Sequence, residues 1–71
     1  MREFDHAGPV LSQWLCERGM TAADLSRQTG IDAGILRSVL SGKRKSISTR
    51  NLLLLARYFG LSMRQLIDTI S

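Results

Sequence analysis

The chain has 71 residues, 44% of them hydrophobic and 23% charged, which is enough for one small globular domain with a single core. Ten Lys and Arg against six Asp and Glu give a formal net charge of +4, which favours polyanionic partners such as nucleic acid or an anionic membrane surface. No apolar run approaches the roughly 20 residues that span a bilayer, and residues 1–5 contain no apolar signal core, so we expect a cytosolic protein with no membrane partner.

Glycines and capping residues divide the chain into five segments of helical length, and no strand pattern competes with them. Residues 1–7 come first and are expected to form a flexible N-terminal arm, in which Arg2 is a candidate for one contact with a nucleic-acid backbone. The first helix is expected to begin at Gly8-Pro9 and to end at Gly19. Its apolar positions recur at helical spacing and are Val10, Leu11, Trp14 and Leu15.

The second and third helices follow one another closely. Thr21 and Asp24 have the spacing of a capping box that starts the second helix, and Gly30 is suited to the left-handed residue at its end. Asp32 can cap the third helix, which is predicted over residues 32–41.

The turn between these two helices has only about three residues, so the helices must cross at a sharp angle. Such a crossing needs a small residue at the contact, which is Ser26, and apolar residues that lock the corner. The predicted lock consists of Leu25, Ile31, Leu36 and Val39.

The opposite face of the third helix carries only small or polar residues, at positions i, i+3, i+4 and i+7, which are Gly34, Arg37, Ser38 and Ser41. A helix with this face fits the major groove, where Arg37 can pair with guanine or a phosphate and the serine hydroxyls can meet bases or phosphates. The basic run Lys43-Arg44-Lys45 follows directly and is suited to flanking phosphates. The alternative for this run is a solvated loop that only keeps the domain soluble.

The last third of the chain holds a surplus of apolar residues. Ser48 can cap a fourth helix that ends at Gly60, and Ser62 with Gln65 repeats the capping-box spacing for a fifth. Residues 52–55 are four consecutive leucines, which one helix face cannot bury together. Either the fifth helix covers these surplus apolar residues, or the residues form a surface for a dimer or another partner. The candidates for that surface are Leu53, Leu54, Met63, Ile67 and Ile70.

Two residue types that often build chemical sites occur once each. Cys16 has no partner for an internal disulfide, and His6 as the only histidine gives neither a zinc site nor an acid–base pair. The sequence therefore predicts no metal, no cofactor and no enzymatic activity.

The whole pattern resembles the Cro and phage-repressor family of helix-turn-helix domains over residues 9–68. The residues that carry the resemblance are Leu15, 18–21, 24–26, 29–31, Leu36, Val39, 41–43, 55–62 and Leu66. The resemblance implies an all-α, compact five-helix lambda-repressor-like domain. It also implies a homodimeric repressor that binds double-stranded DNA and places helix 32–41 in the major groove.

In that family the helix before the recognition helix touches the DNA backbone. Carried over by position, base reading falls on Ala33, Gly34 and Ser38, with Arg37 adjacent, and Ala22 stands where members often have a phosphate-anchoring Gln. Because those amides are missing, we expect modest sequence specificity or a larger share from phosphate contacts and DNA shape. The candidate phosphate contacts are Thr21, Ala22, Arg27, Ser41, Lys43, Arg44 and Lys45.

Two other interpretations stay open. The missing amides also fit an antitoxin-like or other protein-interaction module that binds its partner through the apolar surface of the fourth and fifth helices. Alternatively, these 71 residues are one domain of a longer regulator.

Overall fold

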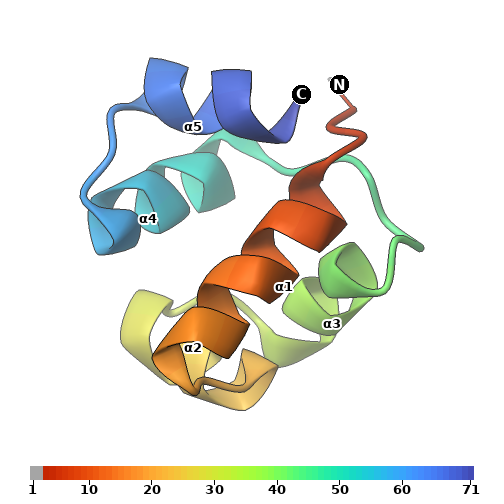
Figure 1. Cartoon of the computed structure of the whole chain (residues 1–71), viewed down its shortest axis with the longest axis vertical. Helices are drawn as coiled ribbons and strands as arrows, with labels where there is room; N and C mark the ends of the chain where they lie inside the picture. The colour runs from red at the N-terminus through yellow and green to blue at the C-terminus, as the bar shows by residue number, and fades with distance from the viewer. Residues whose placement is uncertain (1–2) are drawn as a thin grey trace.

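The computed structural model describes residues 3–71, and within them the chain forms five α-helices and no strand. Figure 1 shows α1 running through the middle of the molecule, with α2 and α3 towards one end and α4 and α5 towards the other. None of the helices in this part of the chain is long and apolar enough to cross a membrane. The helices are α1 (Ala7–Arg18), α2 (Ala22–Thr29), α3 (Ala33–Leu40), α4 (Thr49–Phe59) and α5 (Met63–Ile70).

The helix ends confirm the predicted caps. Thr21 and Asp24 form a complete capping box at α2, Ser62 and Gln65 form another at α5, and the Ser48 side chain accepts from the first turn of α4. The α3 helix ends at Leu40, one residue before the predicted boundary. With the Asp32 side chain accepting from the N–H of Ile35 at the start of α3, local hydrogen-bonding signals in the sequence fix four of the five helix starts.

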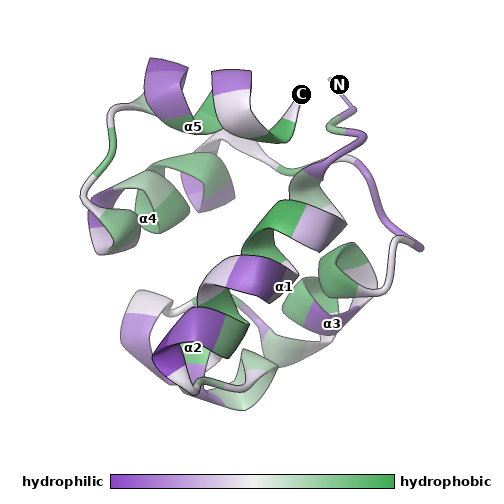
Figure 2. Ribbon diagram, in the orientation of Figure 1, coloured by the Kyte–Doolittle hydropathy of each residue, from purple (hydrophilic) through white to green (hydrophobic). Residues whose placement is uncertain are grey.

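One hydrophobic cluster joins all five helices. The residues predicted to lock the α2–α3 corner are all buried in it. Trp14 and Phe59 are only half-buried, and their ring centroids lie 4.8 Å apart at the edge of the cluster. Figure 2 shows the helices turning apolar faces inward and polar faces outward. The buried cluster is Phe4, Ala7, Leu11, Leu15, Leu25, Ile31, Leu36, Val39, Ile47, Leu52, Leu55, Ala56, Leu66 and Ile70.

The N-terminal segment, residues 3–6, differs from the flexible arm predicted for residues 1–7. Phe4 is only 2% exposed, and its N–H donates to the carbonyl of Lys45 at 2.7 Å. Ala7 is buried as the first residue of α1. Helical periodicity could not identify Phe4 as a core residue, because it precedes the first helix and its partners are distant in the sequence. Arg2, the proposed backbone contact, lies outside the described residues.

Gly8 marks a close approach between α1 and α3. A Cβ atom at this position would lie 2.8 Å from the carbonyl oxygen of Val39 and 3.2 Å from that of Leu40. Only a glycine lets the first turn of α1 pack this tightly against the last turn of α3. In the sequence Gly8 indicated only a helix start, whereas in the structure it helps to set the position of α3.

Candidate nucleic-acid interface

The corner between α2 and α3 is fixed by hydrogen bonds as well as by packing. The Ser26 hydroxyl donates to the carbonyl of Ile31 at 2.5 Å, and the Thr29 hydroxyl donates to the carbonyl of Leu25 at 2.7 Å. The Thr29 oxygen also accepts from the N–H of Ile31 at 3.2 Å. Gly30 makes the turn with φ of 79°, a conformation that side chains rarely adopt. The sequence indicated the small size of Ser26 but not its hydrogen bond, which ties α2 to the turn that follows it.

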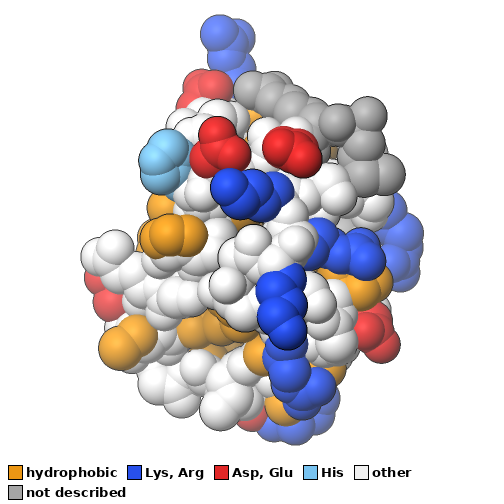
Figure 3. Space-filling view, turned by 90° about the vertical axis from the view of Figure 1, so that its right-hand side faces the viewer, with side chains coloured by type: hydrophobic (Ala, Val, Ile, Leu, Met, Phe, Trp, Pro, Cys, Tyr) orange, Lys and Arg blue, Asp and Glu red, His pale blue; other side chains and the backbone are white. Residues whose placement is uncertain are grey.

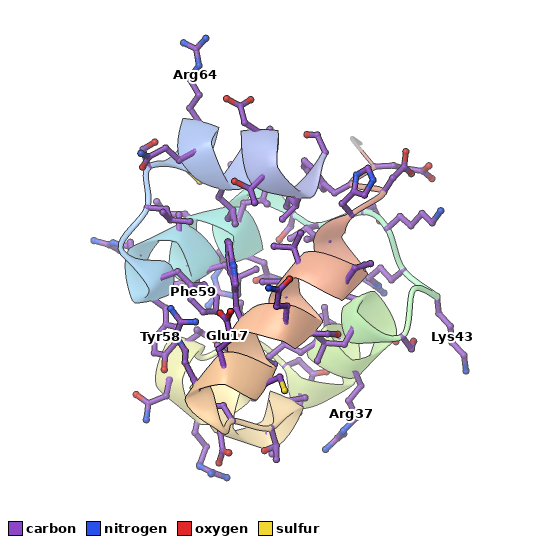
Figure 4. All side chains as sticks on the ribbon, in the orientation of Figure 1. Glu17, Arg37, Lys43, Tyr58, Phe59 and Arg64 are labelled. Carbon is purple, nitrogen blue, oxygen red and sulfur yellow. The ribbon has the colours of Figure 1, made fainter. Side chains whose placement is uncertain are left out.

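The predicted reading face of α3 points outward. Arg37 is exposed, and Figure 4 shows its side chain extending away from the body of the protein. Within residues 3–71 no acidic group pairs with it. Ser38 is half-buried and Ser41 exposed on the same helix end. The structure therefore places a free guanidinium where a groove-reading side chain is expected.

The first turn of α3 places a capping carboxylate next to a glycine at position 34. The carboxylate of Asp32 caps the helix by accepting from the N–H of Ile35 at 3.0 Å. A Cβ atom at the exposed Gly34 would lie 2.9 Å from an oxygen of that carboxylate. A side chain at position 34 would require this carboxylate to shift, and the neighbouring Ala33 is half-buried. The first turn thus offers no hydrogen-bonding side chain from the two positions predicted to read bases.

The basic loop folds back onto the end of α3. The N–H of Arg44 donates to the carbonyl of Ser38 at 3.0 Å, and the Ser41 hydroxyl donates to the same carbonyl at 3.1 Å. Lys43, Arg44 and Lys45 are all exposed. Figure 3 shows Lys and Arg side chains following one another along this side of the molecule, and Figure 4 shows Lys43 extending into solvent on the same side as Arg37.

The start of α2 is already neutralised. The N–H of Thr21 donates to the Asp24 carboxylate at 2.9 Å, the N–H of Asp24 donates to the Thr21 hydroxyl at 3.1 Å, and Arg27 forms an ion pair with the same carboxylate. The hydrogen bonds from Thr21, followed by the charge of Arg27, lower the pKa of Asp24 below its ordinary value. Thr21 and Arg27 were predicted to contact phosphates, but both are engaged within the chain, and Ala22 between them is half-buried.

The predicted dimer or partner surface divides into buried and accessible residues. Leu53 is 43% exposed, and among residues 3–71 no other large hydrophobic side chain is exposed. Leu54, Met63 and Ile67 are half-buried. Ile70 is completely buried in the core, so its inclusion in this surface was wrong; it packs under the N-terminal segment at the end of α5. The fifth helix thus covers part of the apolar surplus and leaves the rest accessible.

An apolar hollow of about 620 Å³ lies beside this surface, between the N-terminal segment, α4 and α5. Met63 and Ile67 form one wall, and Phe4 contributes to the other. The remaining lining residues are Ile47, Ser48, Thr49 and Leu52.

Comparison with known families gives one clear match. A family model described as the Cro/C1-type HTH DNA-binding domain matches residues 10–71. The matched part contains the whole of α2 to α5, including the locked corner and the basic loop. No curated protein and no solved structure matches the chain.

Proposed function

Because this chain belongs to the Cro/C1-type helix-turn-helix DNA-binding family, we propose that it is a cytoplasmic transcriptional repressor with α3 in the major groove of its operator. The family is a DNA-binding one and not an enzymatic one. The observation that carries the proposal is the free Arg37 on α3, followed on the same side by the exposed cations of residues 43–45. Binding in the major groove requires a helix face that points outward, and contacts with the flanking phosphates require positive charges beside that helix.

The two kinds of cation have different roles in this proposal. Arg37 reads a base, most simply guanine, through its guanidinium, whereas Lys43 neutralises a phosphate whatever the sequence. Ser38 and Ser41 add contacts at the end of α3 that meets the loop. Since Ala33 and Gly34 supply no hydrogen-bonding side chain, the expected specificity is modest and depends partly on DNA shape.

Selection of bound sites from a random duplex pool, followed by affinity measurements on two variants, tests this division. Arg37→Ala should relax the preference at one base position by about 1–3 kcal/mol. Lys43→Ala should weaken binding to every sequence alike, by about eightfold at 0.1 M salt for one lost phosphate contact. Equal losses on every sequence from both variants would contradict the assignment of base reading to Arg37.

A homodimer would account for the remaining apolar surface. Two α3 helices about 34 Å apart would enter successive major grooves on one face of the duplex. The exposed Leu53, together with the half-buried Leu54, Met63 and Ile67 of the same two helices, supports an isologous contact through α4 and α5. Sedimentation should show that Leu53→Gln weakens the dimer while Ser12→Ala, at an exposed position of α1 and therefore outside the proposed contact, leaves it intact. A monomeric wild type would contradict the dimer.

The second candidate function is a protein-interaction module that uses the same surface of α4 and α5. The exposed Leu53 favours it as well, because a large exposed apolar side chain fits a foreign partner as readily as a second copy. A stoichiometric complex with another protein, together with absent affinity for duplex DNA at low salt, would favour this function over the repressor.

A further inference from the structure

We propose that Asp5 is a built-in competitor of DNA for Lys45, so that the docked N-terminal segment lowers the affinity of the basic loop for phosphate. The N-terminal segment is defined here as residues 3–6. This inference rests on the proposed DNA binding and concerns how strongly the same interface binds.

The N-terminal segment is anchored at both ends. Phe4 is buried, its N–H donates to the carbonyl of Lys45, and Glu3 pairs with Ser46 in a single antiparallel bridge. On the other side the N–H of His6 donates to the carbonyl of Ile70 at 2.9 Å. Asp5 therefore lies on a fixed stretch of backbone beside the basic loop, and its charge is not that of a freely moving tail.

The Asp5 carboxylate faces the last cation of the loop. One of its oxygens lies 3.7 Å from the Nζ atom of Lys45, and the two side chains are 69% and 50% exposed. By contrast, Lys43 and Arg44 form no ion pair with any acidic residue in the described range. Figure 3 shows acidic side chains gathered next to a basic one on this face. One of the three loop cations is thus partly neutralised before DNA arrives.

The relative strengths of the two interactions give the size of the effect. An exposed ion pair shifts an equilibrium by up to about fivefold. A phosphate contact is worth about eightfold at 0.1 M salt, because it releases roughly 0.9 of a counterion from the duplex. DNA therefore takes Lys45 from Asp5, and the cost of breaking the pair is subtracted from the affinity. Asp5 therefore lowers the affinity of the chain for DNA without preventing binding.

The test is the affinity of the full chain for a duplex at 0.1 M salt. We expect Asp5→Asn to bind about two to five times more tightly than the wild type. The matched control is Glu17→Gln, which removes the same charge from an exposed residue of α1. Figure 4 shows Glu17 on the side of the molecule away from Lys43. Screening over that separation should keep the affinity of the control within about 1.5-fold of the wild type.

Melting midpoints of both variants should stay within a few degrees of the wild type, because both side chains are exposed.

A double-variant cycle separates local competition from a general charge effect. Lys45→Ala should lose only about two- to fourfold in affinity, less than Lys43→Ala, because Lys45 already gives up a partner on binding. In the Lys45→Ala background, Asp5→Asn should gain no more than Glu17→Gln does.

The inference is overturned if Asp5→Asn equals the control, or if its gain persists without Lys45. These outcomes leave DNA binding intact and differ from a failure of the proposed function, in which the wild type and all variants fail to bind a duplex at low salt. That second result would contradict both the proposed DNA binding and the role of Asp5.

Discussion

The two ends of the surface around α3 carry basic residues in the sequence, but the fold leaves their charges in different states. At the α2 end, Arg27 pairs with Asp24, whose carboxylate also holds the amide of Thr21. At the loop end, Lys43 and Arg44 are exposed and take part in no ion pair formed within residues 3–71. A helix that starts with an acidic capping box stabilises itself and gives up its attraction for an outside anion. A basic residue contributes its full phosphate contact only where no neighbour has already paired with it, and a paired one contributes less.

The largest expected effect comes from removing the free cations. The double substitution Lys43→Ala with Arg44→Ala should weaken duplex binding by about sixtyfold at 0.1 M salt and make the log–log salt slope shallower by about 1.8, since two phosphate contacts are lost. Fluorescence anisotropy over a salt series measures both quantities. A loss smaller than about fivefold would mean that the loop is the solvated segment of the alternative interpretation.

The next largest effect is expected from a substitution at the contact between α1 and α3, which holds α3 in place. Gly8→Ala would place a methyl group 2.8 Å from the carbonyl oxygen of Val39, so α1 and α3 must separate. We expect a loss of about 1–3 kcal/mol in the free energy of unfolding, as for other overpacked contacts. Chemical denaturation measures it, with Ser12→Ala, at an exposed position of the same helix, as the matched control. Equal stability of the two variants would show that α3 is not held at this contact.

A smaller effect, on the stability of the domain, is expected from the Asp24 capping box at the start of α2. Because the folded pKa of Asp24 is lowered, the stability it contributes is fully present above the ordinary carboxyl pKa of about 4 and is lost as pH falls below it. The melting temperature of the wild type should therefore exceed that of Asp24→Asn at pH 6, and the difference should shrink as the pH is lowered below about 4. Parallel melting curves at every pH would contradict the charged capping box.

The smallest expected effect is that of Arg27→Ala. Its charge is already balanced by Asp24, so duplex affinity should stay within about twofold of the wild type and the salt slope should not change. A loss as large as that of Lys43→Ala would show that DNA opens the Asp24 pair, and the contrast between the two ends would no longer hold.

Which features the sequence could predict follows from the range of the interactions involved. The caps, the three-residue turn and the apolar lock depend on residues only a few positions apart, and all of them were predicted. Phe4, Gly8 and the Asp5–Lys45 pair depend on contacts between distant segments, and sequence spacing gave no sign of them. Ile70 was misplaced because a helical stripe does not tell which of its members the N-terminal segment will cover.

The central claim is that α3 and the free cations beside it bind duplex DNA. The most direct measurement is the affinity of the wild type for a duplex as a function of salt concentration. The account predicts a linear log–log plot with a slope of about −1.8 or steeper, since at least Lys43 and Arg44 neutralise phosphates. Absence of binding at about 50 mM salt, or an affinity that does not change with salt, would contradict it.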